Sequence, residues 1–314
     1  MALLRSTFIS LSRNRPLRRF SEGSHLGRRL SSRFVAGTRT DEVLAAAAAL
    51  NQQGIAVTLD SLGENVHSEQ EALRSAAIYH ELLDAIQQRR LNGNISVKLS
   101  QMGMELDPAI AERIVRDLTG HARATGNFVR IDMEGSAYTQ RTLDLFEQRL
   151  YPTYRENVGI VLQSYLYRTF ADVQRAIAIK ARVRLCKGAY KEPETVAYPD
   201  KKEVDANYVR CLHELLEHGN YPGIATHDEA IIRNAKNFVK EKQIPLNRFE
   251  FQMLYGVRRD LQDRLVREGY RMRVYVPFGT QWYPYLMRRL AERPANVAFI
   301  TGNVLKEMVA RRKG

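Results

Sequence analysis

Hydrophobic and polar residues follow a repeating order along most of the chain. From about residue 40 onward, short β-branched runs that end in polar residues alternate with longer segments whose apolar residues recur at helical spacing. The runs predict strands over residues 55–61, 95–100, 128–134, 159–165, 183–189, 224–228, 249–254 and 273–277.

The segments between these runs have recognisable helix ends. Asp107 precedes Pro108 as an N-cap, and Gly219 and Gly269 follow helical stretches as stops. Strands that alternate with helices over about 250 residues are typical of an α/β (β/α)8 barrel of the TIM type. A doubly wound sheet is the alternative, but no GxGxxG follows the first strand. We expect a barrel over residues 41–314, with a C-terminal helix over the strand ends, preceded by a basic helical arm over 1–40.

Several predicted strands are polar on one face. The polar sets alternate with apolar residues and comprise Ser96, Lys98 and Ser100, then Arg130, Asp132 and Glu134, then Arg182 and Arg184, then Glu250 and Gln252. A period of two puts each set on one side of its strand. Unpaired buried charges are costly, so these groups must bind a polar ligand at the barrel mouth or form an internal salt-bridge network.

The stretch after the last strand, WYPYLMRRLAERP, predicts a helix that opens near Pro284 and stops at Pro294. Tyr285, Arg288 and Arg289 share one face of it. Two guanidinium groups beside an aromatic ring suit a carboxylate or phosphate on a small apolar body, although a solvated basic face is the alternative. His227, at the end of the sixth strand, could serve as a base, a ligand contact or a structural partner.

Charge and cysteine content limit the classes of protein. The net charge is +13, and residues 1–40 contain nine arginines and only one glutamate. This basic segment is compatible with a transit peptide, a nucleic-acid arm, a membrane-surface helix or a cap packed on the main domain. No apolar run reaches the length of a spanning helix. The two cysteines, Cys186 and Cys211, show no disulfide or zinc spacing, and we expect no metal.

Eight segments resemble, in order, those of proline dehydrogenase in its short bacterial form with a single activity. They are LDSLGE, ISVKLSQMG, VRIDMEGS, GIVLQSYLYRT, VRLCKGAYKEP, ATHDEAII, FEFQMLYGVR and YVPFGTQWYPYLMRRLAERPAN, and they extend from about residue 55 to 300.

The resemblance implies FAD at the carboxyl ends of the barrel strands. Arg184 would lie near flavin N5 and act as a catalytic residue, and Lys187 would lie near the cofactor's phosphates. The remaining cofactor contacts would be Met133, Gln163, Gly188, Ala189, Thr226 and His227. Two buried cations in VRLCKGAYKEP would then face an anionic cofactor.

The resemblance also implies a substrate site. Lys98, Arg288 and Arg289 would bind the carboxylate of L-proline, and Leu254, Tyr275 and Tyr285 would enclose its ring. The second catalytic residue, Asp132, would position this cationic cluster. Glu64 would pair with one of the arginines as a gate.

The activity implied is oxidation of L-proline to 1-pyrroline-5-carboxylate, by hydride transfer from proline C5 to flavin N5. Electrons would pass to a membrane quinone, which gives the N-terminal arm a role in peripheral membrane contact. A separate pyrroline-5-carboxylate dehydrogenase would oxidise the product. We expect a cytoplasmic protein that could attach to the inner face of the membrane, with a mitochondrial address left open, and no nucleic-acid partner.

Three other functions stay open at this point. One is oxidation of another cyclic amino acid such as hydroxyproline, with the same carboxylate clamp. Another is reduction of folates on a similar flavin barrel, which would leave the paired arginines without a purpose. The third is a basic binding protein on a barrel scaffold, which would be colourless and would bind DNA in a strongly salt-dependent manner.

Overall fold

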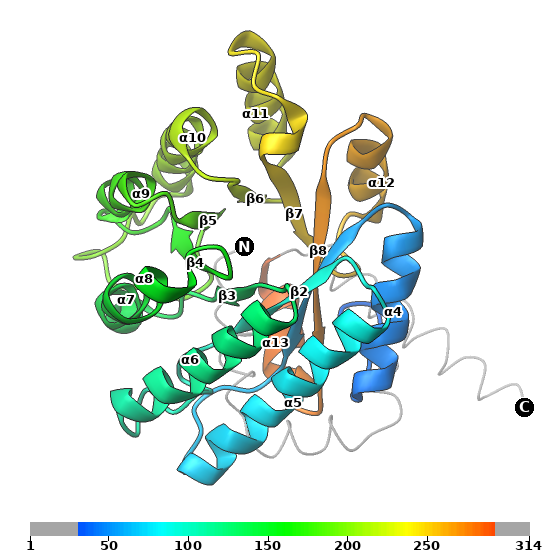
Figure 1. The fold of residues 1–314 in the computed structure, drawn as a ribbon. Helices are drawn as coiled ribbons and strands as arrows, with labels where there is room; N and C mark the ends of the chain where they lie inside the picture. The colour runs from blue at the N-terminus through cyan, green and yellow to red at the C-terminus, as the bar shows by residue number, and fades with distance from the viewer. Residues whose placement is uncertain (1–30, 293–314) are drawn as a thin grey trace, which may run out of the picture.

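Parallel strands close into a barrel in the computed structural model, which describes residues 31–292 (Figure 1). Each strand pairs with the next along the chain, and the last pairs with the first. The strands are β1 Ala56–Ser61, β2 Gly93–Val97, β3 Val129–Ile131, β4 Val158–Gln163, β5 Arg182–Cys186, β6 Gly223–Ala225, β7 Glu250–Leu254 and β8 Met272–Phe278. The predicted barrel is thus confirmed, and the doubly wound alternative is wrong.

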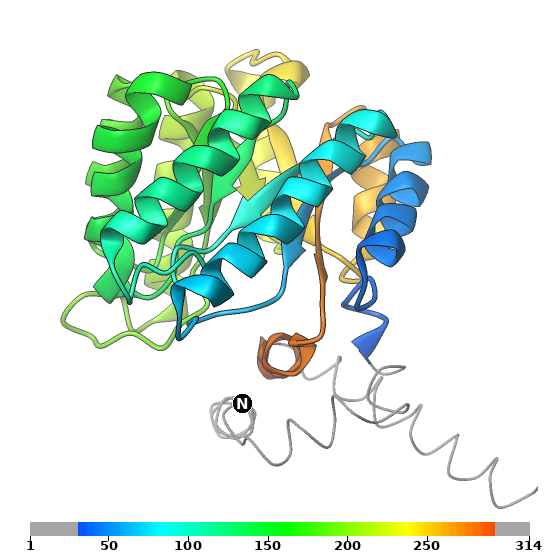
Figure 2. The same cartoon turned by 60° about the horizontal axis from the view of Figure 1, so that its bottom comes forward.

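Helices surround the barrel and connect its strands. They are α4 Thr40–Gln52, α5 Glu69–Gln88, α6 Pro108–Ala124, α7 Ser136–Asp144, α8 Tyr151–Tyr154, α9 Thr169–Ala178, α10 Lys201–His218, α11 Glu229–Glu241, α12 Arg259–Arg267 and α13 Trp282–Glu292. A π-helix, Leu145–Leu150, joins α7 to α8, and a 3-10 turn, Leu246–Arg248, precedes β7. Figure 2 shows α13, in orange, lying across one end of the barrel rather than along its side.

The predicted helix ends agree with the structure. The Asp107 carboxylate accepts a hydrogen bond of 2.8 Å from the Ala109 amide at the start of α6. Gly219 is the C-cap of α10, and Gly269 follows α12 with a φ of +84°. Pro284 lies in the first turn of α13, whereas Pro294 lies outside the described residues.

Five of the predicted strands were too long at their carboxyl ends. β2, β3, β4, β5 and β6 stop before the ranges 95–100, 128–134, 159–165, 183–189 and 224–228 do. The polar alternation of the sequence runs on past the last ladder bond into segments that are not strand. After β3 the Asp132 amide still donates to the Val97 carbonyl at 2.9 Å, whereas after β2 the chain turns from residue 99 onward. These extra residues belong to the loops at the barrel mouth.

The apolar faces of the strands point toward the helices. Val57, Leu59, Ile95 and Val97 are fully buried in one core that also contains Leu82 of α5. This is the packing expected when the other strand face is polar, because only the outward face is then left to bury hydrophobic area against the helices.

The lower part of the barrel interior contains a paired polar network. Glu250 accepts hydrogen bonds from Arg273 at 2.6 and 3.1 Å and from Gln252 at 2.6 Å. Gln252 in turn accepts from Arg184 at 2.6 Å. A Cβ atom added at Gly223 would lie 2.4 Å from the Gln252 amide nitrogen, so a glycine opposite makes room for this layer. The salt-bridge interpretation of the polar strand faces therefore holds for the barrel floor.

Only part of the expected N-terminal arm lies in the described region, since residues 1–30 fall outside it. Phe34 and Val35 pack with Trp282 and Leu62 in a second apolar cluster. The Ala36 amide donates to the Pro277 carbonyl at 2.9 Å, so this segment is fixed beside the end of β8.

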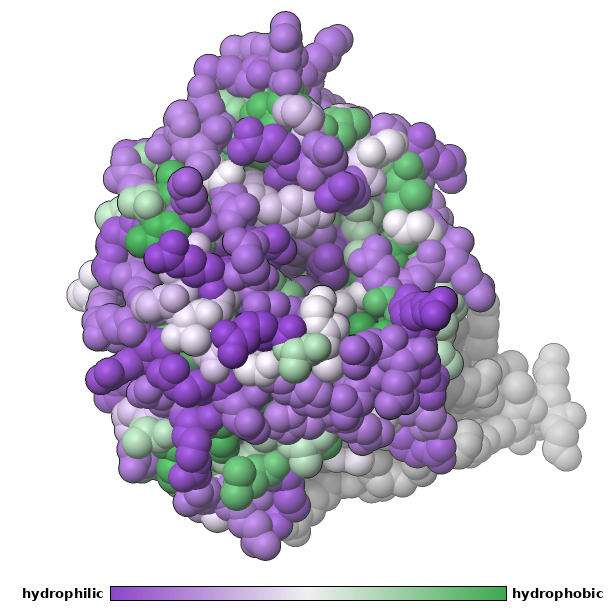
Figure 3. Space-filling model, viewed as in Figure 1, coloured by the Kyte–Doolittle hydropathy of each residue, from purple (hydrophilic) through white to green (hydrophobic). Residues whose placement is uncertain are grey.

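The surface seen in Figure 3 is mainly hydrophilic, with hydrophobic side chains in small separate groups. Among the helices of residues 31–292, we find none whose length and apolar content would allow it to span a membrane.

The barrel floor predicts a specific stability loss. Glu250→Gln would leave Arg273 buried without its counter-charge, and we expect the free energy of unfolding to fall by about 3–5 kcal/mol. Glu268→Gln, which removes the partner of the half-exposed Lys236, should cost about 0–1 kcal/mol and is the matched control. Urea unfolding at pH 7 measures both, and equal losses in the two variants would contradict the network.

The Glu250–Arg273 pair also makes the free energy of unfolding depend on pH. Burial raises the pKa of Glu250, but the charge and hydrogen bonds of Arg273 outweigh it and leave that pKa below its usual value. A lowered carboxyl pKa gives stability above the usual glutamate pKa that is lost as the pH falls through the folded-state value. Glu250→Gln should therefore be less sensitive to acid than the parent protein, and the difference between the two should shrink as the pH is lowered.

Candidate functional site

A cavity of about 690 Å³ opens at the carboxyl ends of the strands, on the side of α13. Its walls include every residue that the sequence assigned to a site, namely Glu64, Lys98, Asp132, Met133, Gln163, Arg184, Lys187, Gly188, Ala189, Thr226, His227, Leu254, Tyr275, Tyr285, Arg288 and Arg289. The structure therefore brings together residues that span more than two hundred positions of the chain.

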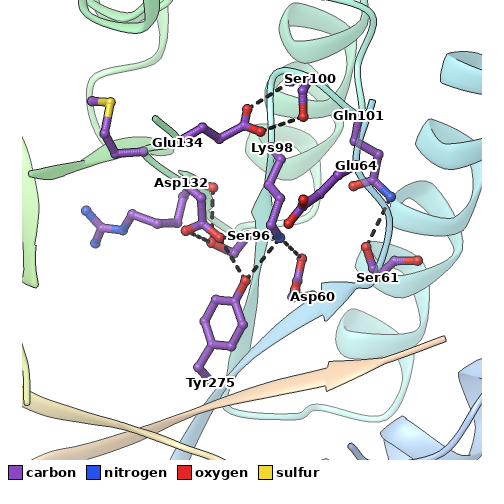
Figure 4. Close-up of polar contacts among 12 residues, drawn as sticks. Asp60, Ser61, Glu64, Ser96, Lys98, Ser100, Gln101, Asp132, Glu134 and Tyr275 are labelled. Atoms are coloured by element: carbon purple, nitrogen blue, oxygen red, sulfur yellow. Dashed lines mark hydrogen bonds and ion pairs between the residues drawn. The ribbon is translucent and has the colours of Figure 1, made fainter. Parts of the chain in front are cut away.

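Lys98 lines the cavity and lies among acceptor groups (Figure 4). Its ammonium donates to Asp60 at 2.8 Å and to the Tyr275 hydroxyl at 3.4 Å, with Asp132 at 3.8 Å. Burial would lower the pKa of Lys98, but the carboxylates of Asp60 and Asp132 outweigh it and raise that pKa well above its usual value. Lys98 is therefore a permanent cation aimed into the cavity.

Asp60 was missed by the sequence analysis. Its side chain is only 1% exposed, and burial raises its pKa despite the neighbouring Lys98. The Tyr79 hydroxyl lies 3.3 Å from the same carboxylate. The sequence does contain a pattern that indicates Asp60. Thr58 and Asp60 alternate with Val57 and Leu59, just as the polar residues of the other strands alternate with apolar ones.

Asp132 connects the cavity wall to the barrel interior. One of its oxygens accepts from Arg184 at 2.8 Å and from Ser96 at 2.6 Å, and the other accepts from Tyr275 at 2.8 Å. The Arg184 guanidinium also lies 5.3 Å from the centre of the Tyr275 ring. Asp132 thus fixes side chains from three separate strands, β2, β5 and β8.

Two buried polar atoms beside this cluster have no partner within the described structure. They are Nη2 of Arg184 and Oε1 of Gln163, whose residues are 6% and 3% exposed. An orphaned buried donor or acceptor costs about 1–3 kcal/mol, so a bound group that satisfies both is favoured. A flavin ring presents donors and acceptors along its edge, and these residues fit it.

The loop after β5 allows a ligand to approach the backbone closely. Gly188 has a φ of +113°, and a Cβ atom there would lie 2.4 Å from the ring of Tyr165. Only glycine fits both the conformation and the contact.

The outer end of the cavity contains a balanced group of charges. Lys187 pairs with Asp205 at 2.5 Å and with Asp228 at 2.9 Å. Burial raises the pKa of Asp228, but the hydrogen bond from Lys187 outweighs it and holds that pKa below its usual value. A phosphate group bound here would share Lys187 with these carboxylates.

One ring nitrogen of His227 accepts a hydrogen bond from the backbone. Its Nε2 accepts a hydrogen bond of 3.0 Å from the Leu254 amide, which links the ends of β6 and β7. Of the roles that the sequence left open for His227, this contact is a structural one. It does not conflict with a ligand contact through the rest of the ring.

The paired arginines of α13 differ in their surroundings. Arg288 forms an ion pair with Glu64 at 3.0 Å, and Arg289 lies 5.1 Å from the centre of the Tyr285 ring. Burial lowers the pKa of Arg288, but the Glu64 charge outweighs it and raises that pKa. The helix face is therefore part of the cavity wall and not a solvated basic face.

Tyr190 also lines the cavity and was not assigned to the site from sequence. Burial, followed by the charge of Glu64, raises the pKa of its hydroxyl. Tyr190 stays neutral at physiological pH and can donate a hydrogen bond near the Glu64–Arg288 pair.

Comparison with known proteins gives concordant matches. The model of the family described as "Proline dehydrogenase" matches residues 43–302. Proline dehydrogenase 1 of Bacillus subtilis is 42% identical over 307 residues, which cover 97% of this chain and all of the relative. Proline dehydrogenase of Deinococcus radiodurans is 42% identical over 280 residues, covering 88% of this chain and 90% of that protein.

A solved structure matches as well. Proline utilization A from Bdellovibrio bacteriovorus, inactivated by N-propargylglycine, superposes with a TM-score of 0.78 and 28% identity. The match covers 84% of this chain and 32% of that one, so the chain spans about a third of the length of that larger protein.

The two thiols provide a test of the site's electrostatics. Burial raises the pKa of Cys186 and of Cys211 to about 12 in each case. At pH 8 the thiolate fraction would be about 10⁻⁴, compared with about a quarter for a free cysteine. We expect iodoacetamide at pH 8 to leave the folded protein unmodified by intact mass, and to add two groups after unfolding in urea. Rapid alkylation of one cysteine in the folded protein would show that its thiol pKa is not raised by burial.

Proposed function

This chain belongs to the proline dehydrogenase family, whose members catalyse the first step of proline catabolism, and we propose that it oxidises L-proline to 1-pyrroline-5-carboxylate in the cavity above the barrel. Family membership implies a flavin-dependent enzyme, and we propose FAD as the flavin. The single observation that supports this function most strongly is that the orphaned buried atoms of Gln163 and Arg184 share one cavity with the cations Lys98, Arg288 and Arg289.

The cofactor would be held by residues from β3 to β6. Gln163 and Arg184 would satisfy their free atoms on the flavin ring, and Met133 would contact the ring. Gly188 and Ala189 would give a close backbone, with Lys187 near the phosphates. Thr226 and His227 would contact the ribityl or pyrophosphate part. When bound, the flavin would accept a hydride at N5 from proline C5.

The substrate would be held by its carboxylate. Lys98 contributes a buried ammonium to the cavity wall, and Arg288 and Arg289 of α13 contribute guanidinium groups to it. Charge-assisted hydrogen bonds from these groups would fix the carboxylate, and Leu254, Tyr275 and Tyr285 would enclose the ring. Asp132 would hold Arg184 and Tyr275 in place while the substrate reacts.

Glu64 would act as a gate over this site. It pairs with Arg288 at 3.0 Å in the present structure. An incoming carboxylate would compete with Glu64 for that guanidinium, so binding and closure would be linked.

The remaining parts of the reaction concern groups outside the cavity. We propose that electrons pass to a membrane quinone, with the basic N-terminus as a peripheral membrane contact. A separate pyrroline-5-carboxylate dehydrogenase would take up the product.

An absorbance spectrum of the purified protein tests the proposal directly. We expect flavin bands that bleach when L-proline is added without oxygen, because the bound flavin would be reduced. Flavin bands that persist with proline would exclude proline as substrate. A protein that binds no flavin when FAD is supplied would contradict the proposal entirely.

The arginine clamp predicts a selective loss of substrate affinity. Arg288→Met and Arg289→Met should each leave the flavin spectrum unchanged and lower kcat/KM mainly through KM, by roughly 2 to 3 kcal/mol of lost charge-assisted hydrogen bonding. Arg267→Met, on the exposed face of α12, is the matched control and should have parent kinetics. Loss of flavin with normal proline affinity would show that α13 serves the cofactor.

A further inference from the structure

The loop between β5 and α10 carries the residues proposed to contact the cofactor, Lys187 to Ala189, and it continues to Asp200 before the next helix begins. It lies at the same end of the barrel as α13 (Figure 2). A loop of this length needs fixed points if its first residues are to be held against a ligand.

One fixed point is an exchange of backbone contacts with the loop after β4. Leu166 and Ala197 form an antiparallel bridge, and the Tyr198 amide donates to the Tyr165 carbonyl at 2.8 Å. These contacts secure the second half of the loop. At the start of the loop, the Tyr165 amide donates to the Lys187 carbonyl at 2.9 Å. Between these two anchored parts, residues 188–192 make no further backbone–backbone hydrogen bond within the described structure, so side chains must position them.

Glu192 supplies that positioning. One of its carboxylate oxygens accepts from the Ser136 amide at 2.8 Å and from the Tyr165 hydroxyl at 3.3 Å. The other accepts from the Ser136 hydroxyl. All three donors belong to other segments of the chain, at least 27 residues away.

The contact with Ser136 also completes helix α7. Its N-cap residue is Gly135, which has no side chain to cap the first turn. Glu192 takes that role from a distant part of the chain, and a carboxylate at a helix N-terminus is favoured by the helix dipole as well as by the hydrogen bond. Gly135 and Ser136 follow the end of β3 after the short segment Asp132–Glu134. The hydrogen bonds from Ser136 therefore link Glu192 to the end of β3.

The contact with Tyr165 reaches the cofactor loop. The Tyr165 ring occupies the space where a Cβ atom of residue 188 would lie, so the ring packs against Gly188. Burial raises the pKa of Tyr165, and the neighbouring Glu192 charge raises it further, which keeps the hydroxyl protonated as a donor. Tyr165, whose hydroxyl donates to Glu192, therefore packs against the backbone of Gly188, the residue after Lys187.

We infer that Glu192 is a positioning residue for the cofactor site: it connects the end of β3, through Ser136, to the β5 loop, through Tyr165, and so sets the backbone of Gly188 and Ala189. The inference rests on the proposed function, because the β5 loop is taken to bind FAD. Glu192 itself is not among the residues that line the cavity.

The test is a fluorescence titration of FAD into the flavin-free full-length chain. We expect Glu192→Ala to raise the FAD Kd by about tenfold or more, since three hydrogen bonds to a carboxylate are lost. Glu192→Gln should stay within about threefold of the parent, because its amide oxygen can still accept from Ser136. Glu194→Ala, on the same loop but exposed, is the control and should bind as the parent does.

Steady-state kinetics at saturating FAD separate positioning from general damage. The proline KM of Glu192→Ala should change less than about twofold there, because the carboxylate clamp is intact. Ser136→Ala, which removes one hydroxyl only, provides a milder variant with a Kd between those of the parent and Glu192→Ala.

The outcomes distinguish this inference from the proposed function. Equal FAD affinity in the parent and Glu192→Ala would overturn the inference alone, as would failure of Glu192→Gln to restore affinity. A parent chain that binds no FAD would overturn the proposed function and the inference with it.

Discussion

The contact between Asp132 and Arg184 is the constraint on which the site depends. A guanidinium inside a barrel is stable only if its charge is paired and its donors are bonded. Asp132 meets that need at 2.8 Å and also accepts from Ser96 and Tyr275. Because these partners come from β2, β5 and β8, one carboxylate fixes the relative positions of side chains from three separate strands of the barrel.

At the barrel mouth the cations are paired, but two buried hydrogen-bonding atoms have no partner within the described residues. Lys98 is balanced by Asp60 and Lys187 by Asp205 and Asp228, which keeps both cations in place before any ligand arrives. Arg184 and Gln163 each keep one buried atom without a partner in the described structure. Preorganised groups of this kind cost no reorganisation when a ligand binds, and they are the usual source of stabilisation in enzyme sites.

Much of this could be predicted from the sequence, for identifiable reasons. The barrel followed from alternating strand and helix periods, and the cavity residues from polar alternation along strands such as 128–134 together with the resemblance to a family. The strand ends could not be predicted, because the polar alternation of the sequence continues into the loops and turns that follow the last ladder bonds. Asp60 carried the same alternation and could have been found. Glu192 could not, since its partners Ser136 and Tyr165 are adjacent only in the folded barrel.

A crystal structure of the flavin-loaded protein is the most direct test of the proposed cofactor site. We expect Nη2 of Arg184 and Oε1 of Gln163 each to lie within about 3.2 Å of a polar atom of the flavin, with the Asp132 contact to Arg184 retained. A flavin bound elsewhere, with both atoms still lacking a partner, would contradict it.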